Sequence, residues 1–158
     1  MSLREVARRA GVSHTSASHH FGSRMGLLTA IASEGYTKLA QAMLDARSEH
    51  DFLEVGVAYV QFAVANPASF DVMFRPDLHD PDDEELRKAK AKAADALYGR
   101  HPGSRPPQRE QIAGAVAAWS IVHGLANLLI NGNIPTELGS DPAAITREVS
   151  SHLSPLRR

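Results

Sequence analysis

Two short helical patterns joined by a glycine turn begin this chain, and they constrain its fold more than any other feature. Apolar side chains recur with helical spacing at Leu3, Val6, Ala7 and Ala10. Gly11 accepts the left-handed backbone that ends helices, and Ser13 can cap a second helix over residues 14–20. This spacing predicts a helix-turn-helix in which Val12 and Ala17 fill the gap between the two helices.

The second helix is polar. It offers Ala17 as an inward residue before Phe21, while His14, Thr15 and Ser16 face outward. In a helix-turn-helix this helix enters the major groove of DNA and presents its N-terminal residues to base edges. Hydroxyl and imidazole groups can bond to base edges and phosphates. We therefore expect double-stranded DNA as a partner; the alternative is a solvated pair of surface helices.

The first 24 residues are basic. Four arginines, Arg4, Arg8, Arg9 and Arg24, stand against Glu5 and give a net charge of +3. The whole chain has a formal net charge of −1, so the other residues carry −4. A basic front on a mildly acidic body is expected where one end of a protein meets a polyanion.

The rest of the chain also shows helical spacing. A long helix to about Arg47 carries an apolar side at Leu28, Ile31, Gly35, Leu39, Ala42, Met43 and Ala46. Further helices are predicted over residues 52–66, 67–74, 82–98, 108–131 and 141–153, and no alternating strand pattern occurs. The predicted fold class is all-α. A helix-turn-helix domain with its connecting long helix (residues 1–47) precedes a larger helical ligand-binding and dimerisation domain (residues 51–158).

The sequence gives no support for a metal site, a cofactor or an enzyme. There is no cysteine, so disulfides and thiolate ligands are excluded. His19 and His20 point about 100° apart on a helix, and no carboxylate stands at ligand spacing beside His123. No nucleophile–base pair or phosphate-binding glycine loop occurs, and the acidic run of residues 80–85 is typical of a solvated loop and helix start. We expect no catalytic residues, no metal and no cofactor.

Trp119 and His123 are four residues apart, so they share one side of a helix. One interpretation is that they line a ligand pocket with Tyr59, Phe62, Phe70, Met73, Phe74 and Tyr98. The other is a packed core in which His123 bonds a neighbouring carbonyl. A pocket of this composition suits an apolar or aromatic small molecule.

Residues 113–130 form an apolar run with the length of a marginal membrane span. The run contains Ser120, His123 and Asn127, so we interpret it as a buried helix of a soluble protein. A helix that is apolar all round is buried all round. We expect a second subunit to cover it, and we expect Gly124 to allow close helix approach. The chain shows no apolar signal core at its N-terminus, which predicts a cytoplasmic location.

The segment "LREVARRAGVSHTSASHHFGSRMGLLTAIA" resembles the DNA-binding domain of the TetR (tetracycline-repressor) family. Further on, "NPASFDVMF" and "WSIVHGLANLLINGNI" resemble the ligand-binding domain of the subgroup named for its Trp, His and Gly, here Trp119, His123 and Gly124. The resemblance implies a homodimeric repressor that binds a palindromic operator and is released by a small molecule. By position, it implies a DNA-binding set of His14, Thr15, Ser16, Ser18, His19, His20 and Arg24, with Ser18, His20 and Arg24 at the sugar–phosphate backbone.

The chain departs from the family pattern in two places. Ser18 stands where the family usually has a tyrosine, which shortens one backbone contact. Family members also carry a helix of roughly 15–20 residues before the position of Leu3, so Leu3, Val6, Phe21 and Leu28 are expected to lose part of their cover. Exposing one large apolar side chain costs about 1.5–3 kcal/mol. Either the start lies further upstream or DNA binding is weakened, and the alternative function is a ligand-binding helical dimer without competent DNA binding.

Overall fold

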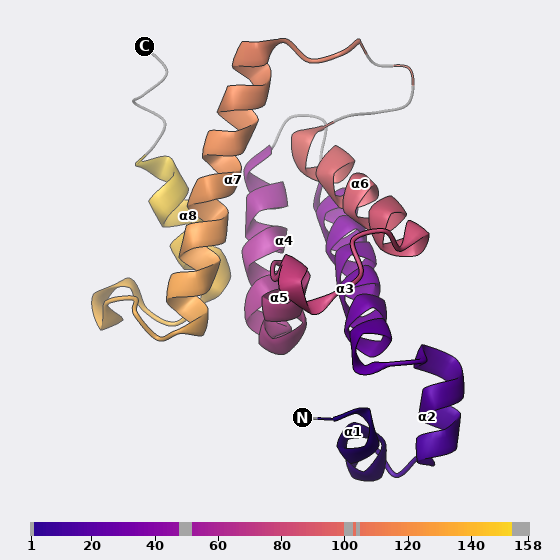
Figure 1. Cartoon of the computed structure of the whole chain (residues 1–158). Coiled ribbons are helices and arrows are strands. Elements are labelled where there is room, and N and C mark those ends of the chain that lie inside the picture. Colours follow the sequence, from indigo (N-terminus) through magenta and orange to yellow (C-terminus); the bar gives the residue numbers. More distant parts are fainter. Residues whose placement is uncertain (1, 48–51, 100–102, 104, 153–158) are drawn as a thin grey trace.

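The structure is a computed structural model, and it describes residues 2–47, 52–99, 103 and 105–152. Within these ranges the regular structure is entirely helical, which confirms the all-α fold class (Figure 1). The elements in chain order are α1 (Leu3–Arg9), α2 (His14–Phe21), α3 (Arg24–Ala46), α4 (Phe52–Ala65), α5 (Pro67–Met73), the 3-10 helix η1 (Pro76–Leu78), α6 (Glu84–Tyr98), α7 (Arg109–Ile130), the 3-10 helix η2 (Thr136–Leu138) and α8 (Pro142–Ser151).

Helices α1 and α2 lie together at one end of the molecule, beside the start of α3 (Figure 1). Serine side chains cap all three helices: Ser2, Ser13 and Ser23 accept hydrogen bonds from the backbone N–H groups three residues further on. Gly11 has a φ of 70°, the left-handed backbone that the turn between α1 and α2 requires. The predicted helix-turn-helix therefore forms, with the predicted cap at Ser13 and the predicted turn at Gly11.

The packing between α1 and α2 differs from the sequence prediction at one position. Val12 is 52% exposed and does not fill the gap between these helices. Leu3, Ala7 and Ala17 form the buried cluster there, and Leu27 packs against it from α3. Val12 lies in the turn between the two helices and points into solvent. Leu27 of α3 packs against the cluster instead, and a prediction that considered only α1 and α2 could not include it.

The four residues expected to lose cover at the helix-turn-helix differ in burial. Leu3 is only 8% exposed, because it belongs to the cluster between α1 and α2. Val6, Phe21 and Leu28 are half-buried. The prediction was therefore wrong for Leu3.

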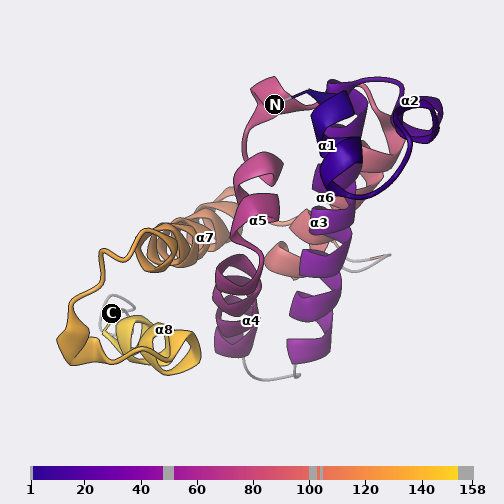
Figure 2. The same ribbon diagram turned by 90° about the horizontal axis from the view of Figure 1, so that it is seen from below.

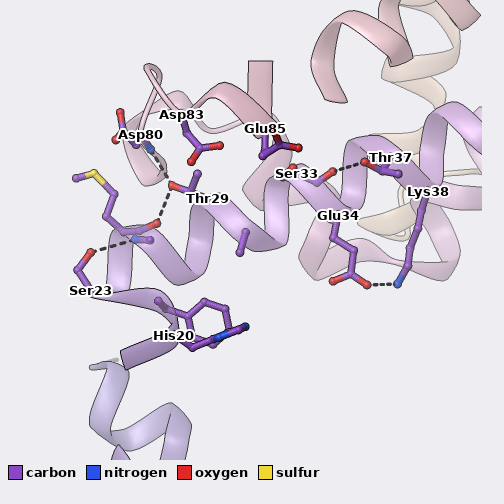
Figure 3. A pocket seen from close by; sticks show the side chains of 14 residues that line it. His20, Ser23, Thr29, Ser33, Glu34, Thr37, Lys38, Asp80, Asp83 and Glu85 are labelled. Carbon is purple, nitrogen blue, oxygen red and sulfur yellow. Dashed lines mark hydrogen bonds and ion pairs between the residues drawn. The ribbon is translucent and has the colours of Figure 1, made fainter. Parts of the chain in front are cut away.

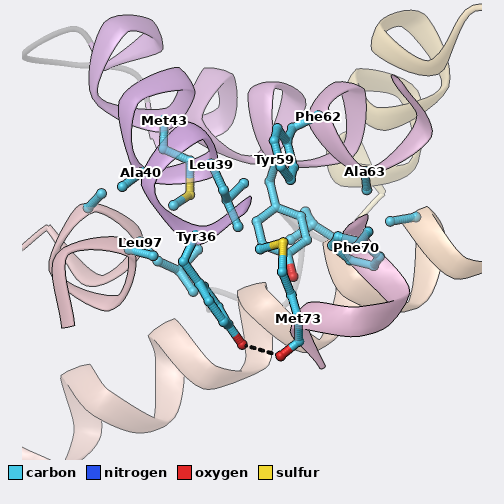
Figure 4. Close-up of a cluster of buried hydrophobic side chains, with 14 of the residues drawn as sticks. Tyr36, Leu39, Ala40, Met43, Tyr59, Phe62, Ala63, Phe70, Met73 and Leu97 are labelled. Carbon is cyan, nitrogen blue, oxygen red and sulfur yellow. Dashed lines mark hydrogen bonds between the residues drawn. The ribbon is translucent and has the colours of Figure 1, made fainter. Parts of the chain in front are cut away.

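The body of the protein consists of three layers of helices (Figures 1 and 2). Helix α4 is in the middle, with α3 and α6 on one side and α7 and α8 on the other. Its Tyr59 and Val60 are 1% and 0% exposed, and they pack with Leu39 and Met43 of α3 (Figure 4). Because α4 contacts both outer layers, its sequence is apolar on nearly all sides.

The buried side of α3 is broader than its sequence suggested. Leu28, Ile31, Ala42 and Ala46 are half-buried, whereas Thr29, Ala32, Tyr36 and Ala40 are buried. Helix α3 contacts α4, α5 and α6, so three neighbours cover a wider sector than a single apolar stripe. The polar side chain of Thr29 can be buried because its hydroxyl donates to the carbonyl of Met25 and accepts from the N–H of Asp80.

Helix α7 combines a buried side with an apolar side that faces solvent. Val122, Leu125 and Ala126 are buried, while Ile112, Val116 and Leu128 are 48%, 40% and 44% exposed. By length and composition alone α7 could cross a membrane, a test that core helices of soluble proteins also pass. Its buried side packs on α4, so it forms part of the helical body, and none of the described residues covers its exposed side.

Gly35 sets the distance between α3 and α5. A Cβ atom added at Gly35 would lie 2.5 Å from Met73 Sδ and 2.7 Å from Ser69 Oγ. We predict that Gly35→Ala lowers the free energy of unfolding by about 1–3 kcal/mol, because the added methyl group overpacks this contact. Urea denaturation followed by circular dichroism measures the change.

Gly114→Ala is the matched control, because no neighbouring atom of the residues that the structure describes lies within 4 Å of a Cβ built there. Alanine favours a helix over glycine by about 1 kcal/mol, so this variant should be at least as stable as the wild type. Equal stability of Gly35→Ala and the wild type would contradict the close-packing argument.

Candidate DNA interface and ligand site

Helix α2 buries one side and presents the rest to solvent. Ala17 is 7% exposed and packs toward α1. The residues predicted to bind DNA are accessible: His14, Thr15, Ser16, His19, His20 and Arg24 are exposed, and Ser18 is half-buried. All seven lie on α2 and the first turn of α3, at the end of the molecule away from α7 and α8 (Figure 1).

Side-chain hydrogen bonds order the surface of α2. Ser13 Oγ accepts from the backbone N–H of Ser16 at 3.0 Å and lies 2.8 Å from Ser16 Oγ. One turn further on, His14 Nε2 and Ser18 Oγ are 3.3 Å apart. These bonds hold the hydroxyl and imidazole groups on the helix surface before any partner is bound.

The positive charge predicted for this end is partly neutralised within the chain. Arg9 forms an ion pair with Glu5 at 2.8 Å. Arg4, Arg8 and Arg24 are exposed and form no ion pair with any residue that the structure describes. Three guanidinium groups therefore remain available for anions such as the phosphates of a duplex.

The ligand-site candidates meet at a hydrogen-bonded group of three side chains. The indole N–H of Trp119 donates to the Tyr59 hydroxyl oxygen at 3.1 Å. The same hydroxyl group lies 2.8 Å from His123 Nδ1. Trp119 and His123 come from adjacent turns of α7, and Tyr59 reaches them from α4. We call these residues the Tyr–Trp–His triad.

The direction of the bond between Tyr59 and His123 depends on which nitrogen of His123 carries the proton. An indole N–H can only donate, so the Tyr59 oxygen accepts from Trp119. When the hydrogen of neutral His123 is on Nε2, Nδ1 accepts the Tyr59 proton. Burial lowers the pKa of His123 from its ordinary value, which favours the neutral form.

Four further aromatic contacts extend the triad toward α5. The ring centroids of Phe74 and His123 are 4.7 Å apart, and those of Phe70 and His123 are 5.3 Å apart. Phe74 also contacts Trp119 at 6.3 Å, and Phe70 contacts Tyr59 at 5.8 Å. Helices α4, α5 and α7 thus bring five of the eight predicted ligand residues into one cluster of rings.

The eight predicted residues divide by exposure. Tyr59, Phe62, Phe70 and Met73 are buried in the core, while Phe74, Tyr98, Trp119 and His123 are half-buried. The packed-core interpretation expected His123 to bond a carbonyl, and its observed partner is a tyrosine hydroxyl instead. The half-buried members are the ones that a ligand can contact without displacing the core.

Two residues near the cluster were not singled out from the sequence. Tyr36 donates from its hydroxyl to the Met73 carbonyl at 2.8 Å, and burial raises its pKa to about 12. Its ring contacts Phe74, with centroids 5.7 Å apart, and Lys90 Nζ lies 5.7 Å from the Tyr36 ring centroid. The spacing of Thr29, Tyr36 and Met43 at intervals of seven could have indicated that Tyr36 faces inward; nothing in the sequence indicated Lys90.

A groove of about 750 Å³ lies where α2 and α3 approach the loop before α6 (Figure 3). Its acidic side chains have partners within the chain: Glu34 pairs with Lys38, Glu85 with Lys88, and Asp83 accepts from the backbone N–H of Leu86. The loop is attached to α3 by the hydrogen bond from the Asp80 N–H to Thr29 Oγ1, at 2.9 Å. The groove is therefore best understood as the joint between the helix-turn-helix and the body.

Metal-ligating side chains do not gather in threes anywhere in the described part of the chain.

Two family models match the sequence. The model described as bacterial regulatory proteins, tetR family, matches residues 1–31, and the one described as Tetracyclin repressor-like, C-terminal domain, matches residues 52–153. No curated protein matches. The two matched segments contain all predicted DNA-binding residues and all predicted ligand-site residues, respectively.

Solved structures with the same fold extend over nearly the whole chain. A protein of unknown function from Rhodococcus sp. RHA1 is similar with a TM-score of 0.72 and 27% identity, over 96% of this chain and 82% of that one. SCO4313, which carries the name of a regulatory protein, is similar with a TM-score of 0.74 and 21% identity, over 96% of this chain and 84% of that one. The second likeness concerns the fold alone.

The lowered pKa of His123 predicts a pH dependence of stability. The unfolded chain binds a proton at this position below about pH 6.5, whereas the folded chain binds it at lower pH. The stability that neutral His123 provides is therefore lost as pH falls below about 6.5. We predict that the free energy of unfolding falls less for His123→Gln than for the wild type when the pH is lowered from about 7.5 to about 5.5. Urea denaturation at the two pH values measures the difference.

His152→Gln is the control, because His152 is an exposed histidine at the end of α8. It should lose as much stability over this range as the wild type. The interpretation of a neutral, hydrogen-bonded His123 fails if His123→Gln and the wild type lose the same amount.

Proposed function

This chain belongs to the tetR family of bacterial regulatory proteins, and we propose that it acts as a ligand-responsive repressor of transcription. As a homodimer it binds a palindromic operator through α2 of each subunit, and a small apolar or aromatic molecule releases it. The proposal rests above all on the exposure of His14, Thr15 and Ser16 on a helix whose opposite side is packed. The family is one of regulators and not of enzymes, and we propose that the protein works in the cytoplasm.

The position of α5 supports a route from ligand to DNA. Phe70 of α5 and Phe74, which follows its last residue, contact the Tyr–Trp–His triad. The chain then runs through η1 to Asp80, whose N–H donates to Thr29 on α3. A ligand that moves α5 would therefore displace a loop attached to the helix that carries the DNA-binding end. It can shift the balance between two arrangements only by binding one of them more tightly.

The exposed side of α7 supports a homodimer. Ile112, Val116, Ser120, Gly124 and Leu128 recur every four residues, and all are exposed. No atom of the described residues lies within 4 Å of a Cβ built at Gly124, so we propose that the close helix approach expected there is made by another subunit. Helix α8 lies beside α7, and we propose a four-helix interface formed by both helices of each subunit. The two α2 helices would then reach half-sites about 34–36 Å apart or somewhat more.

Substitutions at the DNA-binding end test the contacts to DNA. The operator is first selected from a pool of random duplexes, and binding to it is then measured by fluorescence anisotropy. We expect Arg24→Ala to weaken binding to all DNA sequences. The slope of the logarithm of the binding constant against the logarithm of the salt concentration should fall in magnitude by about 1, because one phosphate contact is lost. Thr15→Ala should reduce discrimination between the operator and a single-base variant by about 1–3 kcal/mol.

Arg87→Ala removes an exposed arginine of α6 and serves as the control, with unchanged binding. If the wild type binds no duplex even at low salt, DNA binding is not competent. The ligand-binding helical dimer without DNA binding would then be the better description.

Another prediction concerns the dimer. Val116→Glu and Leu128→Glu should convert a dimer to a monomer in light scattering at micromolar concentration, because each places a charge on the exposed apolar side of α7. Ala91→Glu adds the same charge to an exposed position of α6 and should leave the mass unchanged. A monomeric wild type would refute the proposed interface.

A further inference from the structure

A row of aromatic side chains connects His123 to a lysine on the opposite helix. From α7 the row passes from His123 to Phe74, with centroids 4.7 Å apart, and on to Tyr36, with centroids 5.7 Å apart. It ends at Lys90 of α6, whose Nζ lies 5.7 Å from the Tyr36 centroid. Figure 4 shows Tyr36 between α6 and α7, with its hydroxyl directed to the Met73 carbonyl.

Lys90 is a half-buried cation without a carboxylate partner in the described part of the chain. The neighbouring Lys88 pairs with Glu84 and Glu85, whereas Lys90 has the face of the Tyr36 ring as its contact. Burial lowers the pKa of Lys90, so the charged ammonium is desolvated without a compensating anion. An anion that enters beside Tyr36 would restore this lost solvation.

The other end of the row offers a hydrogen-bond donor. In the neutral tautomer in which His123 Nδ1 accepts from the Tyr59 hydroxyl, His123 Nε2 carries a hydrogen, and that hydrogen has no acceptor among the described residues. Phe74, which belongs to the row, and Trp119, which contacts both Phe74 and His123, are half-buried. The row therefore combines apolar surface with one cation and one neutral donor, which is the composition of a small-molecule site.

We propose that the effector is an organic anion with an aromatic or apolar body, whose negative group pairs with Lys90 while its body lies on Phe74 and Trp119. A hydrogen-bond acceptor on the body faces His123 Nε2. This inference rests on the proposed function and gives the chemical class of the effector. A neutral molecule of the same shape would leave the ammonium of Lys90 desolvated and would bind more weakly.

Two fluorescent probes of nearly equal shape test the charge requirement. The anion 8-anilinonaphthalene-1-sulfonate and neutral N-phenyl-1-naphthylamine share one ring system. Trp119 is the single tryptophan of the chain, so energy transfer from it reports that a probe has bound to the protein, and the Lys90 variants test where it binds. We expect the wild type to bind the anion about tenfold more tightly than the neutral probe, and Lys90→Gln to lose that preference with little change for the neutral probe.

Lys90→Arg keeps the charge and should keep most of the preference, and Lys92→Gln removes an exposed lysine of the same helix and should change nothing. Thermal unfolding of each variant shows that it is folded. The proposal is overturned if Lys90→Gln and the wild type bind the anion equally, if the neutral probe binds as tightly as the anion, or if neither probe accepts energy from Trp119.

Operator binding of Lys90→Gln, measured separately without probe, should equal that of the wild type, since Lys90 lies on α6 and not at the DNA-binding end. Loss of the probe preference with intact operator binding therefore tests the effector class alone. Absence of operator binding in the wild type, with the probe preference intact, would refute the repressor function and leave the anion site standing.

Discussion

The continuity of α3 is the constraint on which the rest of the structure depends. This helix has 23 residues and begins at the Ser23 cap, beside the end of α2. At its other end Arg47 donates to the Ala96 carbonyl at the end of α6, at 2.6 Å. A helix of this length spans about 34 Å, so one rigid element belongs both to the helix-turn-helix and to the core. A change in the core can reach the DNA-binding end without any flexible linker between them.

Local patterns predicted much of this architecture, because helix ends are determined by nearby residues. The serine cap at Ser13, the turn at Gly11 and the exposed side of α2 all follow from a few adjacent positions. The buried sector of α3 did not follow, because its width depends on α4, α5 and α6, which are distant in sequence. Val12 was misplaced for the same reason, since Leu27 from a third helix occupies the position expected for it.

In the candidate ligand site too, local features were predicted and contacts between distant segments were not. Spacing alone placed Trp119 and His123 on one side of a helix, and the shared aromatic character suggested the partners from α4 and α5. The hydroxyl of Tyr59 between indole and imidazole could not be predicted, because it depends on the register of α4 against α7. The role of Lys90 could not be predicted either. In sequence it is one of several lysines of a solvated helix, and its proximity to Tyr36 requires α6 to lie along α3.

Helix α7 would couple ligand binding to dimerisation, because its two sides face the two proposed binding sites. Trp119 and His123 face the aromatic cluster, and Val116 and Leu128 face away from it. A ligand that presses on the inner side of this helix therefore acts on the same rigid element that a second subunit would hold from the outer side. In a dimer joined along α7, a displacement of α7 in one subunit would also move the other subunit. The separation of the two α2 helices would therefore change when a ligand binds to either subunit. Coupling of this kind needs a difference in ligand affinity between two arrangements of α7, and it needs no flexible segment.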